Sequence, residues 1–244
     1  EPGPESAAPT DAFTLTCDDV AVPQDGSNLV LKAARAFADA TGWNGRARFR
    51  LEKRTPLGAG LGGGSSNAAA ALRGLNQFSG RRLSASALAA LAGAVGSDCT
   101  LFLSGGPVVM RGRGERIEPL PSAAAARLRG QRVLVFKPDF GFGTAGAYQQ
   151  MAQRVPPVYL PAEEAERRLA AWLADARAPV AELLFNNLET VAFQKYLALP
   201  ALLDALRQEF GLAVRMSGSG SAWLALLRAE TPVAAVTARI REAW

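Results

Sequence analysis

The sequence of 244 residues contains no histidine and only two cysteines, and both shortages limit its chemistry. Without histidine there is no Ser/His/Asp triad, no histidine general base and no catalytic zinc site of the usual kind. Cys17 and Cys99 are too few for a disulfide framework and lack the partner pattern of a zinc site. We expect both thiols to be reduced and purely structural.

Long apolar runs and aromatic residues are also scarce. No run approaches the roughly 18 apolar residues of a membrane span, and no charged segment leads into an apolar one as in a signal peptide. A cytoplasmic protein without a membrane partner is therefore expected. Aromatic residues make up 7% of the chain and are not interleaved with lysine or arginine as in nucleic-acid stacking platforms. The net charge of +5 suits an anionic ligand, either a phosphorylated metabolite or a nucleic acid, or reflects only a solvated arginine-rich surface.

The spacing of apolar residues predicts both strands and helices. Ser27 is a candidate N-cap of the first helix, and Ser65 or Ser66 is expected near the cap of the helix after the glycines. Because strands and helices do not alternate regularly, α+β layers are favoured over a doubly wound sheet. A change in texture near residue 140 predicts two domains, 1–140 and 141–244. Strands are expected at 12–17, 46–54, 107–112, 115–120, 132–136 and on both sides of a turn within 212–227, and helices at 26–42, 65–78, 84–95, within 143–177, at 200–210 and from 231.

Five glycines lie between positions 58 and 64, directly before an alanine-rich helical segment. Each glycine costs roughly 0.5–1 kcal/mol relative to alanine in ordered backbone, so such a run has a positional reason. Glycines let backbone amides approach a polyphosphate closely, and the helix that follows offers free N–H donors. The hydroxyls of Ser65 and Ser66 are candidate ligands for phosphate or magnesium. A flexible hairpin or linker is the alternative interpretation.

Two better-known phosphate loops do not fit these residues. A Walker A loop requires a lysine after its last glycine, and the chain has no lysine between Lys53 and Lys137. A Rossmann fingerprint can be placed on Gly58, Gly60 and Gly63, but no regular βαβ unit with an acidic residue about 20 positions later follows it. The loop therefore belongs to another class of phosphate site.

The segment PLGAGLGGGSSNAA (56–69) resembles the phosphate-binding motif of the galactokinase, homoserine kinase, mevalonate kinase and phosphomevalonate kinase (GHMP) superfamily. RMSGSGSAWLAL (215–226) resembles the superfamily's C-terminal glycine-rich motif. Within the superfamily, the chain is most similar to the 4-diphosphocytidyl-2-C-methyl-D-erythritol kinases of the non-mevalonate isoprenoid pathway. The similarity rests on four segments in the expected order: GLGGGSSNAA, GSDCTLFLSGG, FKPDFGFGTAGAY and FNNLE.

The resemblance implies a two-domain GHMP kinase fold of α+β class. Residues 1–140 would be a ribosomal-S5-like ATP-binding domain and 141–244 a ferredoxin-like substrate domain, with the active site in the cleft between them. The implied reaction transfers the γ-phosphate of ATP, with Mg²⁺, to the 2-hydroxyl of a small-molecule substrate, 4-diphosphocytidyl-2-C-methyl-D-erythritol. No nucleic-acid partner is implied, and the chain would be a monomer or a weak homodimer.

The resemblance also assigns roles to individual residues. Asp98 would be the base that takes the proton from the substrate hydroxyl, a role that suits a partly buried carboxylate in a loop. Each of these features also has a plainer interpretation. Asp98 would be an exposed aspartate at a helix end, and Lys53 a solvated residue at a strand end. Tyr148 would be a core residue, and MSGSG a hairpin turn. The resemblance implies that Asn28 and Lys53 lie near the adenine and that the nucleotide is held by Gly58, Gly60, Leu61, Gly62, Gly63, Gly64, Ser65 and Ser66. Ser66 would also bind the metal. The substrate would be held by Thr144, by Tyr148 stacking on cytosine, and by Ser217, Gly218, Ser219 and Gly220.

The chain departs from the family pattern in several places. Thr100 stands where the family has proline, and Gly143 where a serine is usual before Thr144. An A-K-I-N-L strand and a D-G-Y-H segment that open the family's sequences do not occur here. We therefore expect a few dozen residues before Glu1, including a lysine partner for Asp98 and a strand that pairs with residues 12–17.

Three alternatives stay open at this point. The chain is another kinase of the superfamily, for homoserine or a mevalonate derivative; or a catalytically inactive member that keeps the ATP loop; or a nucleic-acid-binding module without catalysis. FGTAGAY favours the cytidyl substrate, and the scarcity of aromatic residues disfavours nucleic acid.

Overall fold

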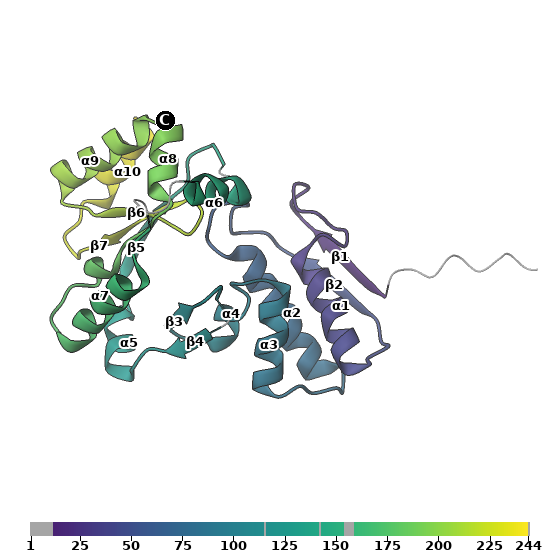
Figure 1. Ribbon diagram of the computed structural model, residues 1–244. Helices are drawn as coiled ribbons and strands as arrows, with labels where there is room; N and C mark the ends of the chain where they lie inside the picture. Colours follow the sequence, from purple (N-terminus) through teal and green to yellow (C-terminus); the bar gives the residue numbers. More distant parts are fainter. Residues whose placement is uncertain (1–11, 115, 142, 154–158, 244) are drawn as a thin grey trace, which may run out of the picture. The chain divides into compact units, whose positions relative to one another are not determined.

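The structure is a computed structural model, which describes residues 12–114, 116–141, 143–153 and 159–243. The chain forms two compact units (Figure 1). The first unit comprises Glu1–Leu57 and Gly62–Leu120, and the second comprises Gly58–Leu61 and Pro121–Trp244. The glycine loop therefore passes from one unit to the other along the chain. The predicted domain division at residue 140 stays a prediction.

The first unit begins with a parallel β-α-β unit. β1 (Phe13–Cys17) pairs with β2 (Ala47–Leu51), and α1 (Leu29–Thr41) connects them. The alternating pattern of both strands turns Phe13 and Leu15 inward, where they are buried with the apolar face of α1, whereas the arginines of β2 are exposed. The other elements of this unit are α2 (Gly63–Phe78), α3 (Ala85–Val95), α4 (Leu101–Ser104) and the antiparallel hairpin of β3 (Val108–Arg111) and β4 (Arg116–Pro119).

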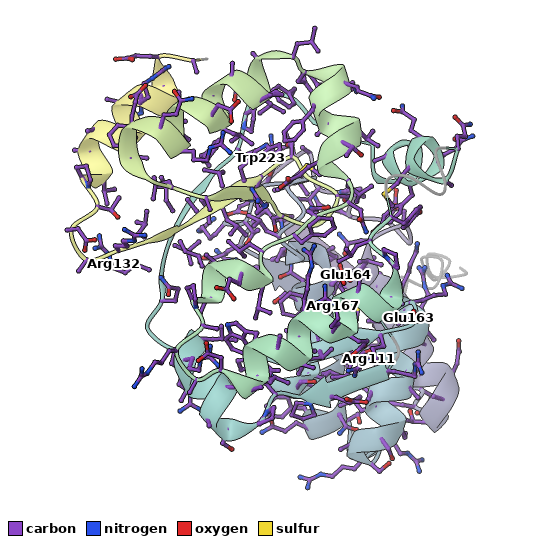
Figure 2. The ribbon with its side chains drawn as sticks, turned by 60° about the vertical axis from the view of Figure 1, so that its left-hand side comes forward. Arg111, Arg132, Glu163, Glu164, Arg167 and Trp223 are labelled. Carbon is purple, nitrogen blue, oxygen red and sulfur yellow. The ribbon has the colours of Figure 1, made fainter. Side chains whose placement is uncertain are left out.

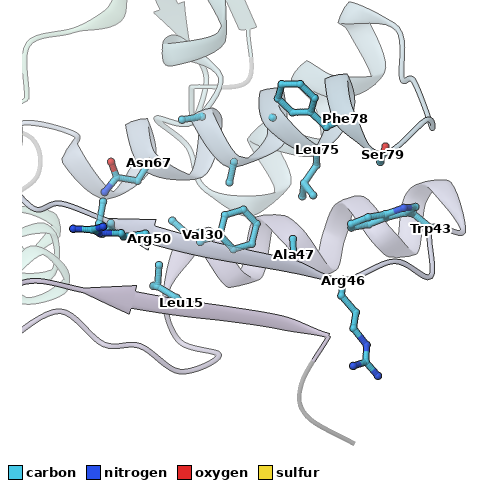
Figure 3. Close-up of a pocket in the computed structure, with 15 residues that line it drawn as sticks. Leu15, Val30, Trp43, Arg46, Ala47, Arg50, Asn67, Leu75, Phe78 and Ser79 are labelled. Carbon is cyan, nitrogen blue, oxygen red and sulfur yellow. The ribbon is translucent and has the colours of Figure 1, made fainter.

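Small side chains let α1 and α2 pack closely. Ala33, Ala34 and Ala68 are buried at their contact, with Phe37 and Leu72 filling the space beside them. A groove of about 480 Å³ runs along β2 and α2, with Phe49, Leu75 and Phe78 among its apolar walls (Figure 3). Its lining residues on α2 begin at Asn67, after the glycine loop has ended.

The second unit is built on an antiparallel sheet. Its strands are β5 (Arg132–Phe136), β6 (Val214–Met216) and β7 (Trp223–Leu227), in the order β5-β7-β6. Trp223 on the central strand, labelled in Figure 2, is fully buried and stacks on Phe193 at 5.8 Å between ring centroids. Leu199, Leu206 and Val236 complete this core. The remaining elements are α5 (Ser122–Leu128), α6 (Thr144–Ala152), α7 (Ala162–Ala174), η1 (Val180–Leu183), α8 (Glu189–Lys195), α9 (Ala198–Phe210) and α10 (Val233–Arg241).

A separate small cluster joins α5 to α7. The guanidinium of Arg127 lies 3.7 Å from the centroid of the buried Trp172 ring, and it donates to the carbonyls of Trp172 and Ala178. On the surface of α7, Glu164 accepts hydrogen bonds from Arg167 and Arg168, one helical turn along (Figure 2). The partly buried arginine fixes the position of α7 more than the exposed ion pairs do.

The predicted α+β class is confirmed, and each predicted strand lies where the alternation placed it. The caps were predicted less well. Asn28, not Ser27, caps α1, accepting from the amide of Val30 at 2.9 Å. The α2 helix begins at Gly63, two residues earlier than predicted, with Gly62 as N-cap, and Ser65 and Ser66 lie near that cap as predicted. The short elements α4, α5, η1 and α8 were not predicted.

The cap assignment of α1 predicts a difference between two neighbouring residues. Asn28→Ala should lower the free energy of unfolding by about 1 kcal/mol, because an orphan amide of the first turn loses its acceptor. Ser27→Ala should change it by less than about 0.5 kcal/mol, the range of an ordinary surface substitution. Urea unfolding of both variants measures this, and equal losses would contradict the assignment.

Candidate functional site

The glycine loop has an alternating left-handed backbone. Gly58, Gly60 and Gly62 have φ angles of 60°, 72° and 67°, and Ala59 and Leu61 lie between them. Residues with a β-carbon rarely adopt this region, so the fold itself requires these three glycines. The loop therefore has a defined backbone path, which disfavours its interpretation as a flexible linker.

The start of the loop lies against the β6–β7 hairpin loop, residues 217–222. The amides of Ser221 and Ala222 donate to the carbonyls of Gly58 and Ala59, each at 3.0 Å. The hydroxyl of Ser217 donates to the carbonyl of Gly60 at 2.8 Å. A β-carbon at Gly60 would overlap the Ser217 carbonyl oxygen. Two glycine motifs far apart in the sequence are thus one backbone assembly within the second unit.

The end of the loop is the N-terminus of α2. Gly62 is the N-cap, and among the described residues no side chain caps this end. The first amides of a helix have no intrahelical acceptor, so they are available to a ligand. A β-carbon at Gly63 would lie 2.8 Å from the ammonium nitrogen of Lys53, which places that cation beside the helix start.

Gly64 differs from the other glycines. Its backbone is helical, and a β-carbon there would meet only Leu29 Cδ1, at 3.5 Å, an ordinary contact. The fold therefore does not require glycine at residue 64, which is exposed. Close approach of a ligand to the first turn of α2 gives this glycine a physical reason.

Asp98 lies in the turn between α3 and α4, within the same unit as the helix start. Its side chain is exposed, which differs from the partly buried carboxylate that we expected. Cys99 beside it is buried, and burial raises the pKa of its thiol, opposed by a hydrogen bond with Ser65. That contact joins the Asp98 turn to the first turn of α2. A β-carbon at Gly114 would lie 2.7 Å from the carbonyl oxygen of Ser97, so the β3–β4 turn packs on this turn as well.

The residues assigned to the adenine have other partners. The Asn28 carboxamide caps α1 and donates to the carbonyl of Pro23 at 2.7 Å. The amide of Lys53 donates to the Asp18 carboxylate at 2.7 Å, and this bond, followed by that of Arg54, holds the pKa of Asp18 below its usual value. Only the Lys53 ammonium extends to the glycine loop, so an adenine contact stays a prediction for both residues.

The residues predicted to bind the substrate lie in the second unit. Thr144 is the first residue of α6, and Tyr148 lies one turn later with 51% of its surface exposed. Tyr148 is therefore not a core residue, and its ring is accessible for stacking. Ser217, Gly218, Ser219 and Gly220 form the hairpin loop that contacts Gly60, so MSGSG is both a hairpin turn and a partner of the first glycine motif.

The hairpin loop is held by two residues of the FNNLE segment, Asn186 and Glu189. The sequence alone assigned neither of them a role. Asn186 Nδ2 donates to the carbonyls of Met216 and Gly218, at 2.8 and 2.7 Å. Glu189 Oε1 accepts from the amide of Met216 at 2.7 Å. Burial raises the pKa of Glu189, opposed by that hydrogen bond and by the charge of Arg215. The only signal in the sequence was an amide and a carboxylate three residues apart, which does not reveal their partners.

Comparisons with known proteins identify the family. The family model described as GHMP kinases N terminal domain matches residues 28–106, and the one described as GHMP kinases C terminal matches residues 163–244. The chain is 40% identical over 224 residues to the 4-diphosphocytidyl-2-C-methyl-D-erythritol kinase of Synechococcus sp. (strain CC9902), covering 88% of this chain and 71% of that protein. It is 35% identical over 219 residues to the enzyme of the same name from Protochlamydia amoebophila, covering 90% and 70%.

Solved structures show the same fold. A crystal structure of 4-(cytidine 5'-diphospho)-2C-methyl-D-erythritol kinase matches with a TM-score of 0.64 and 34% identity, covering 94% of this chain and 76% of that one. A homoserine kinase from Cytophaga hutchinsonii matches with a TM-score of 0.69 at 18% identity, covering 97% and 79%, which indicates the fold alone.

These matches define the chain as a kinase of the GHMP class, with the two-part fold of that class. Within the class it belongs to the family of 4-diphosphocytidyl-2-C-methyl-D-erythritol kinases. Membership of a kinase family implies ATP as a substrate, and the predictions of the family and of a kinase are confirmed. Among the described residues, no helix is long and apolar enough to cross a membrane.

Gly64 provides a test of ligand approach that does not disturb the fold. Gly64→Ala should leave stability unchanged or raise it by up to about 1 kcal/mol, since alanine suits a helix better. It should nevertheless weaken ATP binding about tenfold or more, because even a methyl group displaces a phosphate from the helix amides. Calorimetric titration with a non-hydrolysable ATP analogue measures this.

Gly74→Ala is the matched control, because Gly74 lies in the same helix and a β-carbon there would meet nothing within 4 Å. It should leave the affinity unchanged. If both variants bind the analogue as the parent does, nucleotide phosphate does not approach the start of α2.

Glu189 predicts a pH dependence of stability. Because its pKa is raised in the folded chain from a usual value of 4.5, the folded state holds its proton more tightly. This contribution to the free energy of unfolding is present at pH below the pKa of Glu189 in the unfolded chain, and it is lost as pH rises through the pKa in the folded chain. Arg215 lies beside the carboxylate, and Asp204 and Arg207 line the same pocket, so these groups share its electrostatic environment.

The Glu189→Gln variant cannot ionise, yet its side-chain carbonyl still accepts from Met216. Urea unfolding across pH should find it more stable than the parent at neutral pH, with the advantage shrinking as pH falls toward 4.5. A variant that is less stable at neutral pH would mean that attraction to Arg215 outweighs the cost of burial.

Proposed function

We propose that the protein transfers the γ-phosphate of ATP to the 2-hydroxyl of 4-diphosphocytidyl-2-C-methyl-D-erythritol, a step in isoprenoid precursor synthesis in the cytoplasm. The observation that carries the proposal is the uncapped start of α2, with a glycine that the fold does not require at residue 64 and the Lys53 ammonium beside it. The choice of substrate rests on relatives named 4-diphosphocytidyl-2-C-methyl-D-erythritol kinase, one of which is 40% identical to this chain. We expect a monomer or a weak homodimer.

In this proposal the residues Gly62–Ser66 bind the phosphates of ATP. Their amides donate to phosphate oxygens, the helix end adds its positive dipole, and Lys53 offsets negative charge. Gly58 and Gly60 set the path of the loop, and Leu61 connects Gly60 to Gly62. These contacts fix the γ-phosphate in place, and positioning with charge neutralisation is most of what phosphoryl transfer needs from a protein.

The residues fit a magnesium ion that arrives with the nucleotide. Among the described residues there is no group of three His, Cys, Asp or Glu side chains that could hold a metal by itself. Mg²⁺ takes phosphate and water oxygens with few protein ligands, so the Ser66 hydroxyl is a suitable single contribution. The bound ion would neutralise charge on the transferring phosphoryl group.

Asp98 is the proposed catalytic base. The substrate hydroxyl oxygen forms a bond to the γ-phosphorus, the bond from that phosphorus to the β-phosphate oxygen breaks, and ADP leaves. Asp98 takes the proton that the hydroxyl loses. Its exposed position at a turn leaves the carboxylate accessible to substrate.

The substrate's cytidine end is assigned to the second unit. The exposed Tyr148 ring is available to stack on cytosine, with Thr144 at the start of the same helix. The loop of Ser217–Gly220 is assigned to the substrate as well, since its glycines give backbone access like those at the nucleotide. Asn28 and Lys53 remain the residues proposed near the adenine.

Asp98→Asn separates catalysis from binding. The full-length variant should bind the ATP analogue as the parent does and lose turnover by about 10²–10⁴-fold, the usual contribution of a positioned base. Single-turnover kinetics at saturating substrate measure this. Loss of nucleotide binding instead would make Asp98 a structural or metal-binding residue.

The substrate is tested with a panel of acceptors. The full-length protein is incubated with ATP, Mg²⁺ and one of three alcohols: the diphosphocytidyl substrate, homoserine or mevalonate. We expect ADP release and phosphorylation with the first acceptor alone. Faster turnover of homoserine or mevalonate would contradict the proposed substrate while leaving a kinase.

A further inference from the structure

The hairpin loop of residues 217–222 is held on one side by the glycine loop and on another by FNNLE. Asn186 lies just before α8, and its side chain uses all of its polar atoms locally. Nδ2 donates to the carbonyls of Met216 and Gly218, while Oδ1 accepts from the amide of Leu188 at 2.9 Å. The Asn186 side chain is therefore fixed in orientation by three bonds.

Glu189 adds a bond to the same strand end. Its carboxylate accepts from the amide of Met216, whose carbonyl already accepts from Asn186. Both backbone groups of Met216 are thus bound by side chains of FNNLE, at the point where β6 ends and the loop begins. Glu189 is half-buried there, so water competes poorly for these bonds.

The loop needs such external support because its own backbone is permissive. Gly218 and Gly220 have φ angles of 53° and 82°. Glycine loses more conformational freedom on folding than any other residue, so a loop with two of them is ordered only by its contacts. The next residue after Met216 is Ser217, whose hydroxyl holds the carbonyl of Gly60.

We propose that Asn186 and Glu189 are positioning residues for the kinase site: they fix the loop of residues 217–222, which in turn fixes Gly60 and the path of the glycine loop. They act through this backbone and touch neither nucleotide nor substrate. The ligand-binding part of this inference rests on the proposed function, whereas the ordering of the loop does not.

A loop that adopts its binding shape for only part of the time weakens the apparent affinity in proportion to that fraction. Loss of the Asn186 bonds should therefore have two effects. The amides of the loop, which donate to Gly58, Ala59 and the loop itself, should exchange faster with solvent. The affinity for nucleotide should fall without loss of the fold.

Asn186→Asp is the test variant in the full-length protein. The substitution keeps the side-chain size and the acceptor for Leu188, but replaces the donor to two carbonyls by a negatively charged oxygen. Asn187→Asp is the matched control, because it makes the same change one residue along. Among the described residues, the Asn187 side chain bonds only through its oxygen, which accepts from the amide of Leu160 at 2.9 Å, and aspartate keeps that acceptor.

Two measurements compare the variants: hydrogen exchange at residues 217–222 without ligand, and calorimetric titration with a non-hydrolysable ATP analogue. For Asn186→Asp we expect the hydrogen-exchange rate at residues 217–222 and the dissociation constant of the ATP analogue each to rise by about tenfold or more. For Asn187→Asp we expect both values to stay near those of the parent. If the two variants behave alike, the positioning role is wrong.

Should Asn186→Asp fail to fold, the pair Glu189→Gln and Glu189→Met decides. Glu189→Gln keeps an acceptor for the Met216 amide, so hydrogen exchange at residues 217–222 should match that of the parent. Glu189→Met removes the acceptor, so exchange there should be faster. Equal exchange in both would overturn the role. If the parent fails to phosphorylate the diphosphocytidyl substrate, the proposed function is wrong, and the exchange comparison still decides the role of Asn186.

Discussion

The close contact between Gly60 and the carbonyl of Ser217 is the constraint on which the arrangement of both glycine motifs depends. Any side chain at residue 60 would occupy the position of that carbonyl oxygen. The hydrogen bonds from Ser217, Ser221 and Ala222 to residues 58–60 then hold the two segments together. The left-handed glycines are required here by the protein's own backbone, before any ligand is considered.

A second requirement begins two residues later. At Gly62 the chain enters α2 without a side-chain cap, and the helix start is bordered by Lys53 and by Ser65, which bonds to Cys99 beside Asp98. An uncapped N-terminus costs a soluble protein some stability. These free amides are the groups that the proposed function assigns to the phosphates of ATP. The same short loop thus serves the fold at one end and, in the proposed function, the nucleotide at the other.

Much of the local structure could be predicted from the sequence, because alternation and helical spacing are local properties. The predicted strands AFTLTC and RARFRLEKR contain β1 and β2, and the glycine run leads into a helix that begins at Gly63, two residues earlier than predicted. The cap at Asn28 was missed because Ser27 and Asn28 are equally good caps in isolation, and only the path of the chain from Pro23 selects between them. The helix α8, seven residues long, shows no periodic pattern and is fixed by bonds to β6.

The candidate site was predictable to a smaller extent. Spacing alone indicated a phosphate loop and left a linker open, and the resemblance assigned residues 58–66 to the nucleotide and residues 217–220 to the substrate without predicting the connection between them. That connection is a tertiary contact across 157 positions, which no local pattern contains. The roles of Asn186 and Glu189 were missed for the same reason, since their partners are backbone atoms nearly 30 residues away. A crystal structure of the full-length protein with a non-hydrolysable ATP analogue and Mg²⁺ tests the assignment of the glycine loop most directly. We expect phosphate oxygens within hydrogen-bond distance of the amides of Gly62–Ser66 while Gly60 stays against Ser217; phosphates bound away from the start of α2 would contradict it.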